Sequence, residues 1–307
     1  MAKVFITGIT GFLGSNIADY LIGEGHDVIA TYRTNSSRDL CLSYINRVTW
    51  ILQDEKNEWI NNIANTKPEI VIHAAWLGVG HTERDQWEHQ FLNVNFLKQV
   101  LFIAQKSSSK KFIGLGSQAE YGVFNGCIDE THPSNAAEAY GHVKIICSEI
   151  VKQFCLYNKM DWYWLRLFSF FGKGESENWL IPSLIKKIIF NDDIDLTLGE
   201  QKYSYLYVND LGLAINKIII SQGNCGIYNI SGKVLMALKD LIGKIKDSIN
   251  PEFNLVFGKI PYRHNQSMHM QGDAAKFIKT FGEFEVSDFD SSLLKTIEYF
   301  IEKFNSE

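Results

Sequence analysis

The sequence predicts an α/β protein with a doubly wound, mainly parallel β-sheet followed by a smaller mixed α/β lobe. A short apolar run near the start, residues 3–7, ends in a glycine turn that gives way to a helical pattern. Short apolar runs then alternate with amphipathic helical segments as far as residue 168, and the alternation is less regular afterwards. We therefore expect a first domain over residues 1–168, taking in parts of 203–230, and a second lobe mainly over 169–307.

Composition indicates a reduced, water-soluble protein. The net charge of -5 is modest and the charges are interspersed, which argues against a nucleic-acid groove or a membrane-surface patch. The five cysteines are scattered and lack a C-x-x-C pair, so neither a disulfide frame nor a metal site is expected. The chain enters a strand within three residues and has no apolar run of roughly 18 residues. We expect a cytoplasmic protein with no membrane or nucleic-acid partner.

The glycine turn reads Gly8-Ile9-Thr10-Gly11-Phe12-Leu13-Gly14 and separates the first strand from the first helix. Glycines let such a turn close and let backbone N–H groups approach a pyrophosphate at the positive end of the helix. An ordinary strand-to-helix turn is the alternative, but the position after the first strand favours a Rossmann-type dinucleotide site. The expected contacts are Gly8, Thr10, Gly11, Phe12, Leu13 and Gly14.

The second strand, residues 27–32, is where a selector of the cofactor belongs. An NAD site usually has an acidic residue there for the ribose hydroxyls, whereas an NADP site has arginine near the 2′-phosphate. This strand is followed by Arg33 and Arg38, with no acid between Val28 and Arg38. The pattern favours NADP(H) over NAD(H), although both arginines could be solvated loop charges. A third strand, 48–52, places Asp54 where it could border the adenine.

Two further strands deliver candidate site residues at their carboxyl ends. Residues 69–73 end in His73-Ala74-Ala75, whose small side chains would let the backbone pass close to a cofactor. His73 itself is interpreted as a packed structural histidine. Residues 111–115 form a fifth strand and are followed by Ser117, at the edge where open α/β sheets place their chemistry.

The rest of the pattern is a series of helices and extended segments. Helices are expected at 84–105, 135–157, 181–190, 210–220, 238–248 and 291–304. Extended segments are expected at 162–168, 194–198, 203–208 and 226–230.

Tyr140 and Lys144 lie four residues apart in the helix expected at 135–157, so they share one face of it. The lysine charge favours the ionised tyrosine and should lower the pKa of its hydroxyl into the range of a proton donor or acceptor. The spacing alone is also compatible with an exposed helix pair. The presence of the glycine turn and of Ser117 in the same chain favours a catalytic unit.

Together these features resemble the extended short-chain dehydrogenase/reductases of the NAD-dependent epimerase/dehydratase family, in particular those acting on nucleotide sugars. The resemblance covers almost the whole chain, and its motifs are Thr7–Gly14, His73-Ala74-Ala75, Gly116–Gly122, Asp129-Glu130, Tyr140-x-x-x-Lys144, Leu165-Arg166-Leu167, Tyr205–Asp210, Arg263 and Gly272-Asp273. It implies that Ser117 and Tyr140 hydrogen-bond the reacting oxygen. It also implies that Lys144 holds the nicotinamide ribose and tunes Tyr140.

Departures from the family narrow the expected reaction. The 4,6-dehydratases carry Thr-Asp-Glu where this chain has Ser117-Gln118-Ala119, so dehydration is not expected. The 4-epimerases usually have an acid after the second strand, where this chain has Arg33. The resemblance therefore implies a 4-ketoreductase that uses NADPH to reduce a nucleoside-diphosphate 4-keto-6-deoxy sugar, for a surface polysaccharide such as lipopolysaccharide.

Residues near the motif ends are the candidates for substrate binding. For the sugar pocket they are Trp76, His81, Gln118 and Glu120, and for the diphosphate and nucleotide they are Asn178 and Arg263. Each has a plainer interpretation: Trp76 as a hydrophobic lid, Glu120 as a solvated charge, Arg263 as part of a surface salt bridge.

Two other reactions stay open at this point. A nucleotide-sugar 4-epimerase would keep NAD bound, and a small-molecule ketone reductase of the dihydroflavonol or hydroxysteroid kind would not need Arg263. The helices at 84–105 and 135–157 resemble the pair that forms a dimer interface in the family. A homodimer is therefore expected, although these apolar faces could equally cover the sheet.

Overall fold

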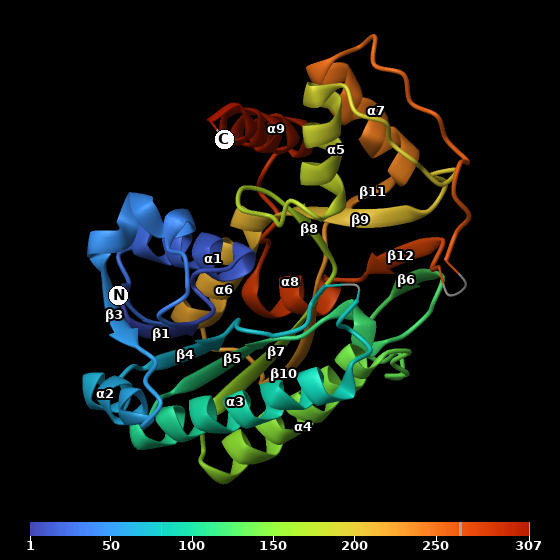
Figure 1. Ribbon diagram of the computed structural model, residues 1–307. Coiled ribbons are helices and arrows are strands. Elements are labelled where there is room, and N and C mark those ends of the chain that lie inside the picture. Colours follow the sequence, from blue (N-terminus) through green and yellow to red (C-terminus); the bar gives the residue numbers. More distant parts are fainter. Residues whose placement is uncertain (81, 264–265, 307) are drawn as a thin grey trace.

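The computed structural model describes residues 1–80, 82–263 and 266–306 and contains two β-sheets (Figure 1). Within these residues the larger sheet has seven parallel strands in the order β10-β7-β5-β4-β1-β2-β3. The strands are β1 (Lys3–Thr7), β2 (Asp27–Tyr32), β3 (Val48–Leu52), β4 (Ile70–His73), β5 (Lys111–Leu115), β7 (Asp161–Leu167) and β10 (Gly226–Ile230). The predicted doubly wound parallel sheet is confirmed.

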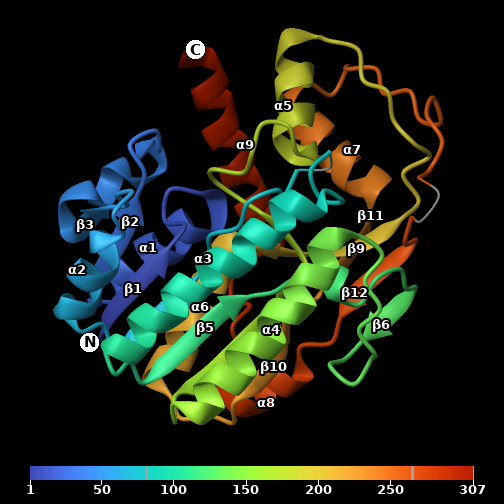
Figure 2. The ribbon, with the colours of Figure 1, turned by 60° about the horizontal axis from the view of Figure 1, so that its bottom comes forward.

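Helices cover both faces of this sheet. One face carries α1 (Phe12–Gly23) and α6 (Val208–Ile220), and the other carries α2 (Glu58–Thr66), α3 (Trp87–Lys106) and α4 (Ala139–Tyr157) (Figures 1 and 2). Because parallel strands are buried on both sides, alternate residues of β1 enter different cores.

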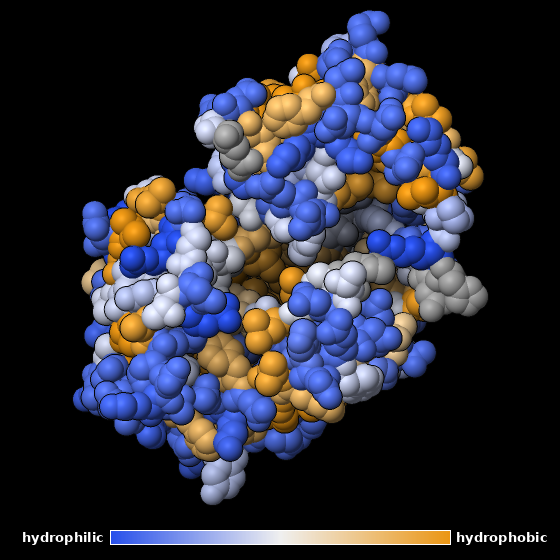
Figure 3. All heavy atoms as spheres, viewed as in Figure 1, coloured by the Kyte–Doolittle hydropathy of each residue, from blue (hydrophilic) through white to orange (hydrophobic). Residues whose placement is uncertain are grey.

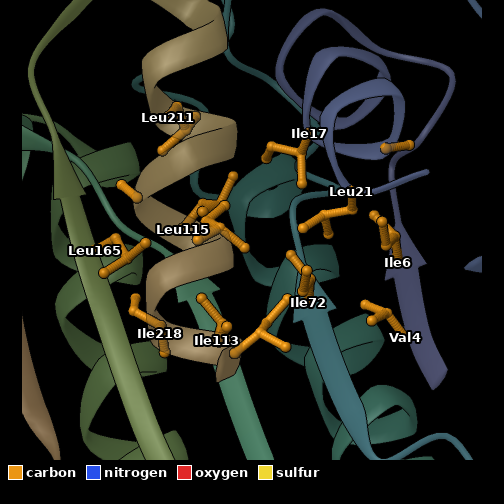
Figure 4. Close-up of a cluster of buried hydrophobic side chains, with 14 of the residues drawn as sticks. Val4, Ile6, Ile17, Leu21, Ile72, Ile113, Leu115, Leu165, Leu211 and Ile218 are labelled. Carbon is orange, nitrogen blue, oxygen red and sulfur yellow. The ribbon is translucent and has the colours of Figure 1, made fainter. Parts of the chain in front are cut away.

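The core between the sheet and the α1/α6 layer shows this alternation directly. Val4 and Ile6 of β1 pack there with Ile17 of α1 and Leu211 of α6 (Figure 4). Phe5, between them, enters the opposite core with residues of α3 and α4. The near-continuous apolar strands of the sequence are thus explained by burial on two faces.

The second lobe is built around a smaller mixed sheet. Its described strands run in the order β11-β9-β12-β6, and β8 also pairs with β9. The elements are β6 (Gly126–Ile128), β8 (Ser169–Phe171), α5 (Leu180–Phe190), β9 (Lys202–Tyr207), β11 (Val234–Ala237), α7 (Leu238–Ile249), β12 (His269–Gly272) and α9 (Phe289–Ser306). The surface is hollowed between the two lobes, with hydrophobic side chains in its depth (Figure 3).

Two segments cross between the lobes against the order of the sequence. β6 lies in the first half of the chain but pairs with β12 of the smaller sheet. β10 and α6 come from the second half, yet β10 pairs with β7 of the larger sheet. A further helix, α8 (Ala275–Phe281), packs beside β10. The chain therefore ties the lobes together at several points.

Several element boundaries differ from those expected. The helix expected from residue 84 begins at Trp87, and the one expected from 135 begins at Ala139. Residues 194–198 form no strand, and Val208 opens α6 instead of ending β9. Two 3₁₀ segments, η1 (Asp39–Arg47) and η2 (Gln118–Glu120), were not expected. In the described ranges no helix is both long and apolar enough to cross a membrane.

Candidate active site

The glycine turn has no room for a side chain at Gly8 or at Gly14. Gly8 has φ +73°, and a Cβ there would lie 2.6 Å from the backbone nitrogen of Ala75. A Cβ at Gly14 would lie 2.1 Å from the carbonyl oxygen of Gly8. The turn therefore closes tightly against Ala74-Ala75 and leads directly into the N-terminus of α1, with Gly11 as its cap residue. Such a cradle fits a dinucleotide pyrophosphate.

His73 at the end of β4 is buried and faces the protein interior. Its Nδ1 lies 3.0 Å from the hydroxyl of Thr7, which also accepts a hydrogen bond from the N–H of Ala75. Burial, reinforced by the charge of Lys144, lowers the pKa of His73 to about 3. The imidazole is therefore neutral at working pH and orders the strand ends beside the glycine turn.

His73 should contribute to acid unfolding. Its pKa is lowered in the folded protein, so between about pH 6.5 and 3 the unfolded chain binds a proton that the folded chain does not. Stability due to the neutral ring is present above this window and is lost as the pH falls through it. We expect His73→Asn, which can still pair with Thr7, to flatten the pH dependence of the unfolding free energy between pH 6 and 4, measured by urea titration. An unchanged slope would contradict this assignment.

Ser117 follows β5 and caps the short η2 segment. Its Oγ accepts a hydrogen bond from the N–H of Ala119 and donates one to Oε1 of Gln118, at 3.2 and 3.0 Å. The side chain of Gln118, half-buried, is thus next to the hydroxyl expected to contact the reacting oxygen. These two contacts hold the Ser117 side chain at the start of η2.

Glu120 lies beneath Ser117, not in the sugar pocket where it was expected. It is 0% exposed. Its carboxylate accepts hydrogen bonds from the N–H of Ser117 (2.9 Å), Nε1 of Trp164 (2.9 Å) and Nε of Arg166 (2.7 Å). A buried carboxylate needs such partners because its desolvation is costly. We therefore correct its assignment from substrate contact to support of Ser117.

Tyr140 and Lys144 lie on one face of α4, as their spacing predicts, and both are buried. The Nζ of Lys144 is 5.7 Å from the ring centroid of Tyr140 and donates to the carbonyl of Leu115 at 2.5 Å. It also lies 3.5 Å from the ring centroid of Trp76, whose ring is nearly perpendicular to that of Tyr140 with centroids 5.9 Å apart. Trp76 is thus packed against both residues.

The expected direction of the tyrosine pKa was wrong. Burial raises the pKa of Tyr140 above its usual value, and this outweighs the lowering by the Arg84 guanidinium and by Ser117. Burial also lowers the pKa of Lys144 to about 7, against the opposing influence of Glu120. Desolvation is the dominant cause for both groups, and residue spacing alone could not reveal it.

The three polar candidates at the carboxyl ends of β2 and β3 differ in their surroundings. Arg33 is exposed just after β2. The guanidinium of Arg38 lies 4.8 Å from the ring centroid of Tyr32. The Asp54 carboxylate accepts hydrogen bonds from the N–H groups of Glu58 and Trp59 at 3.0 and 2.9 Å, so its observed contacts are those of a cap for α2.

The remaining candidates belong to the second lobe or its approach. Asn178 is exposed in the turn before α5, and Arg263 is exposed within the long connection that follows α7. His81 lies outside the described residues. Within those residues no group of three or more His, Cys, Asp or Glu side chains could hold a metal ion.

Arg84 was not singled out from the sequence, yet it contacts Tyr140. Its guanidinium carbon is 4.3 Å from the centroid of the tyrosine ring, and its Nε donates to Glu138 at 2.7 Å. No short motif links residue 84 to residue 140, so only the folded chain reveals the contact.

A family model matches residues 4–231, which include the glycine turn, Ser117, Tyr140 and Lys144. It describes the NAD-dependent epimerase/dehydratase family. The chain belongs to this family. The expected membership is confirmed, and the chain is an enzyme of this NAD-dependent family that acts on nucleotide sugars.

Two curated relatives have names that describe nucleotide-sugar enzymes. The chain is 26% identical over 284 residues to dTDP-6-deoxy-L-talose 4-dehydrogenase (NAD(+)) of Aggregatibacter actinomycetemcomitans, covering 88% of this chain and 99% of that one. It is 25% identical over 285 residues to CDP-abequose synthase of Salmonella muenchen, covering 89% of each.

Solved structures of the family confirm the fold. UDP-glucose 4-epimerase of Thermotoga maritima superposes with a TM-score of 0.88 at 20% identity, covering 98% of this chain and 99% of that chain. The dTDP-glucose 4,6-dehydratase of Streptomyces venezuelae, with NAD bound, gives 0.86 at 18% identity, covering 99% and 98%.

Proposed function

We propose that the protein is a 4-ketoreductase that uses NADPH to reduce a nucleoside-diphosphate 4-keto-6-deoxy sugar. The observation that carries the proposal is the meeting of Ser117, Tyr140 and Lys144 beside the carboxyl end of β5, without a free carboxylate in the serine motif. Gln118 and Ala119 are neutral, and the Glu120 carboxylate is held by Arg166. Support comes from the relative named as a 4-dehydrogenase of a dTDP-linked 6-deoxy sugar.

Each residue has a distinct task in this proposal. The backbone of the glycine turn holds the pyrophosphate, and Lys144 holds the nicotinamide ribose. The bound nicotinamide supplies hydride to a carbonyl carbon. Tyr140 donates the proton that the reduced oxygen needs, and Ser117 orients that oxygen by a hydrogen bond. Arg33 and Arg38 would meet the 2′-phosphate, which is the reason for preferring NADPH.

The deciding experiment follows the absorbance of reduced nicotinamide with dTDP-, CDP- and GDP-linked 4-keto-6-deoxy sugars. We expect NADPH to be consumed faster than NADH, together with loss of the 4-keto sugar. A preference for NADH would contradict the proposal that Arg33 and Arg38 bind the 2′-phosphate. No consumption across the panel, with NAD retained by the purified protein, would favour a 4-epimerase instead.

We also propose that α3 and α4 bind a second copy of the chain. Phe91 and Phe102 are eleven residues apart, three turns of helix, so they share one face of α3, where they are 50% and 41% exposed. Ile146 and Tyr157 share a face of α4 in the same way and are exposed too. The two helices lie side by side (Figure 2), so their exposed apolar side chains could meet those of a second copy in an isologous dimer.

Charge placed on this surface should dissociate the dimer. We expect the wild type to sediment as a dimer and the double variant Phe91→Glu/Ile146→Glu to sediment as a monomer, because the carboxylates would be buried without partners. The exposed Phe190→Glu on α5 is the matched control and should remain dimeric. A monomeric wild type at micromolar concentration would contradict the proposal.

A further inference from the structure

The loop before α3 holds the N-terminus of the helix that carries Tyr140. The first N–H groups of an α-helix have no partner within the helix, and the residue before α4, Glu138, provides no side-chain cap. Asp85 accepts a hydrogen bond from the N–H of Ala139 at 3.1 Å, and the carbonyl of Arg84 accepts one from the N–H of Tyr140 at 2.8 Å. The loop and the start of α4 are therefore one structural unit.

The Arg84 side chain completes this unit from above the tyrosine ring. Its guanidinium carbon lies 4.3 Å from the ring centroid of Tyr140, within the range of a cation–π contact. The ion pair with Glu138 fixes the guanidinium in that place, and the arginine side chain is 27% exposed. A cation held against a phenol favours the ionised form of that phenol.

We propose that Arg84 is a positioning residue for the reaction: its guanidinium, held over Tyr140 by Glu138, stabilises the phenolate that forms when Tyr140 gives up its proton. This inference rests on the proposed function, in which Tyr140 is the proton donor. Arg84 acts through Tyr140 and needs no contact of its own with the sugar.

The other charged groups that face Tyr140 are less suited than Arg84 to stabilise its phenolate. Glu138, just before α4, and Glu120 on η2 both raise the pKa of Tyr140, in the same direction as burial. Lys144 on α4 can be a cation, but burial, with Arg84 acting in the same direction, lowers its pKa to about 7. A guanidinium stays charged throughout the working range. Arg84 therefore places a guanidinium against Tyr140 that does not depend on the charge of Lys144.

If Arg84 served only to support the structure, removal of its charge would leave the ionisation of Tyr140 unchanged. The carbonyl that binds the N–H of Tyr140 belongs to the backbone and remains in every side-chain variant. Arg84→Met removes the charge and keeps an unbranched side chain over the ring, whereas Arg84→Lys keeps a charge. Arg84→Gln is a second uncharged variant in case Arg84→Met does not fold.

The test is a titration of position 140 alone. Difluorotyrosine, whose phenol ionises at lower pH than tyrosine, replaces Tyr140, and fluorine NMR follows its ionisation in each variant. We expect the midpoint to move upward by about one pH unit in Arg84→Met and Arg84→Gln, and to stay near that of the parent in Arg84→Lys. The control Lys110→Met removes an exposed cation of a surface pair and should leave the midpoint unchanged.

Two results would overturn the inference. One is a midpoint in the uncharged variants that coincides with the parent, and the other is an equal shift in Arg84→Lys. The titration needs no sugar substrate, so it is separate from the proposed function. Absence of ketoreductase activity across the substrate panel would overturn the proposed function. The titration would still test the role of Arg84.

Discussion

Replacing Tyr140 by phenylalanine is expected to lower ketoreductase turnover by about 10²- to 10⁴-fold, the usual contribution of a positioned proton donor. The hydroxyl is the only group removed, and the ring remains to pack between Trp76 and the Arg84 guanidinium. Binding of NADPH and the thermal unfolding midpoint should therefore change little. Steady-state rates and cofactor titration by fluorescence measure the two effects separately.

Tyr157→Phe is the matched control for this variant. Tyr157 ends the same helix and is 86% exposed, so loss of its hydroxyl should leave turnover at the wild-type rate. Substantial residual activity in Tyr140→Phe, with the control unaffected, would remove Tyr140 as the proton donor. Loss of cofactor binding as well would indicate a structural defect instead.

The second large effect concerns stability. Glu120→Leu should lower the free energy of unfolding by about 3–5 kcal/mol, because it leaves Arg166 buried without its carboxylate. The N–H groups of Ser117 and Trp164 lose their acceptor at the same time. Urea unfolding followed by tryptophan fluorescence and circular dichroism measures the loss.

A double-mutant cycle separates the ion pair from packing. Glu120→Leu/Arg166→Met should lose less stability than the sum of the two single variants, since neither charge is then left unpaired. Glu69→Gln breaks the exposed pair with Lys110 and should cost less than about 1 kcal/mol. Equal losses for Glu69→Gln and Glu120→Leu would contradict the assigned role of Glu120.

The sequence predicts the parts of this site that depend on local pattern. The geometry of the glycine turn, and the shared helix face of Tyr140 and Lys144, are each determined by a few consecutive residues. Ser117 is placed by the strand before it. The seven-stranded sheet follows from apolar runs that alternate with helices. The short strands β6 and β8 were missed because three residues are too few to show a period.

Contacts between distant segments could not be predicted in the same way. The local sequence around Glu120, a strand followed by a serine, is the same whether its side chain faces a sugar or lies beneath the site. Its partner Arg166 comes from β7, 46 residues later. The contact of Arg84 with Tyr140 likewise spans 56 residues of sequence. The pKa direction of Tyr140 depends on burial, which is a property of the whole fold.

β10 belongs to the larger sheet and α6 covers it, although both come from the second half of the chain. This arrangement has a practical consequence for expressing fragments of the protein. A fragment that ends at residue 168 would lack β10, so β7 would have unpaired N–H and C=O groups along one side. It would also lack α6, whose Leu211 and Ile218 cover the sheet. We expect such a fragment to aggregate, because an open strand edge beside uncovered apolar surface recruits further chains. Expression of either lobe alone is thus a poor route to a cofactor-binding domain.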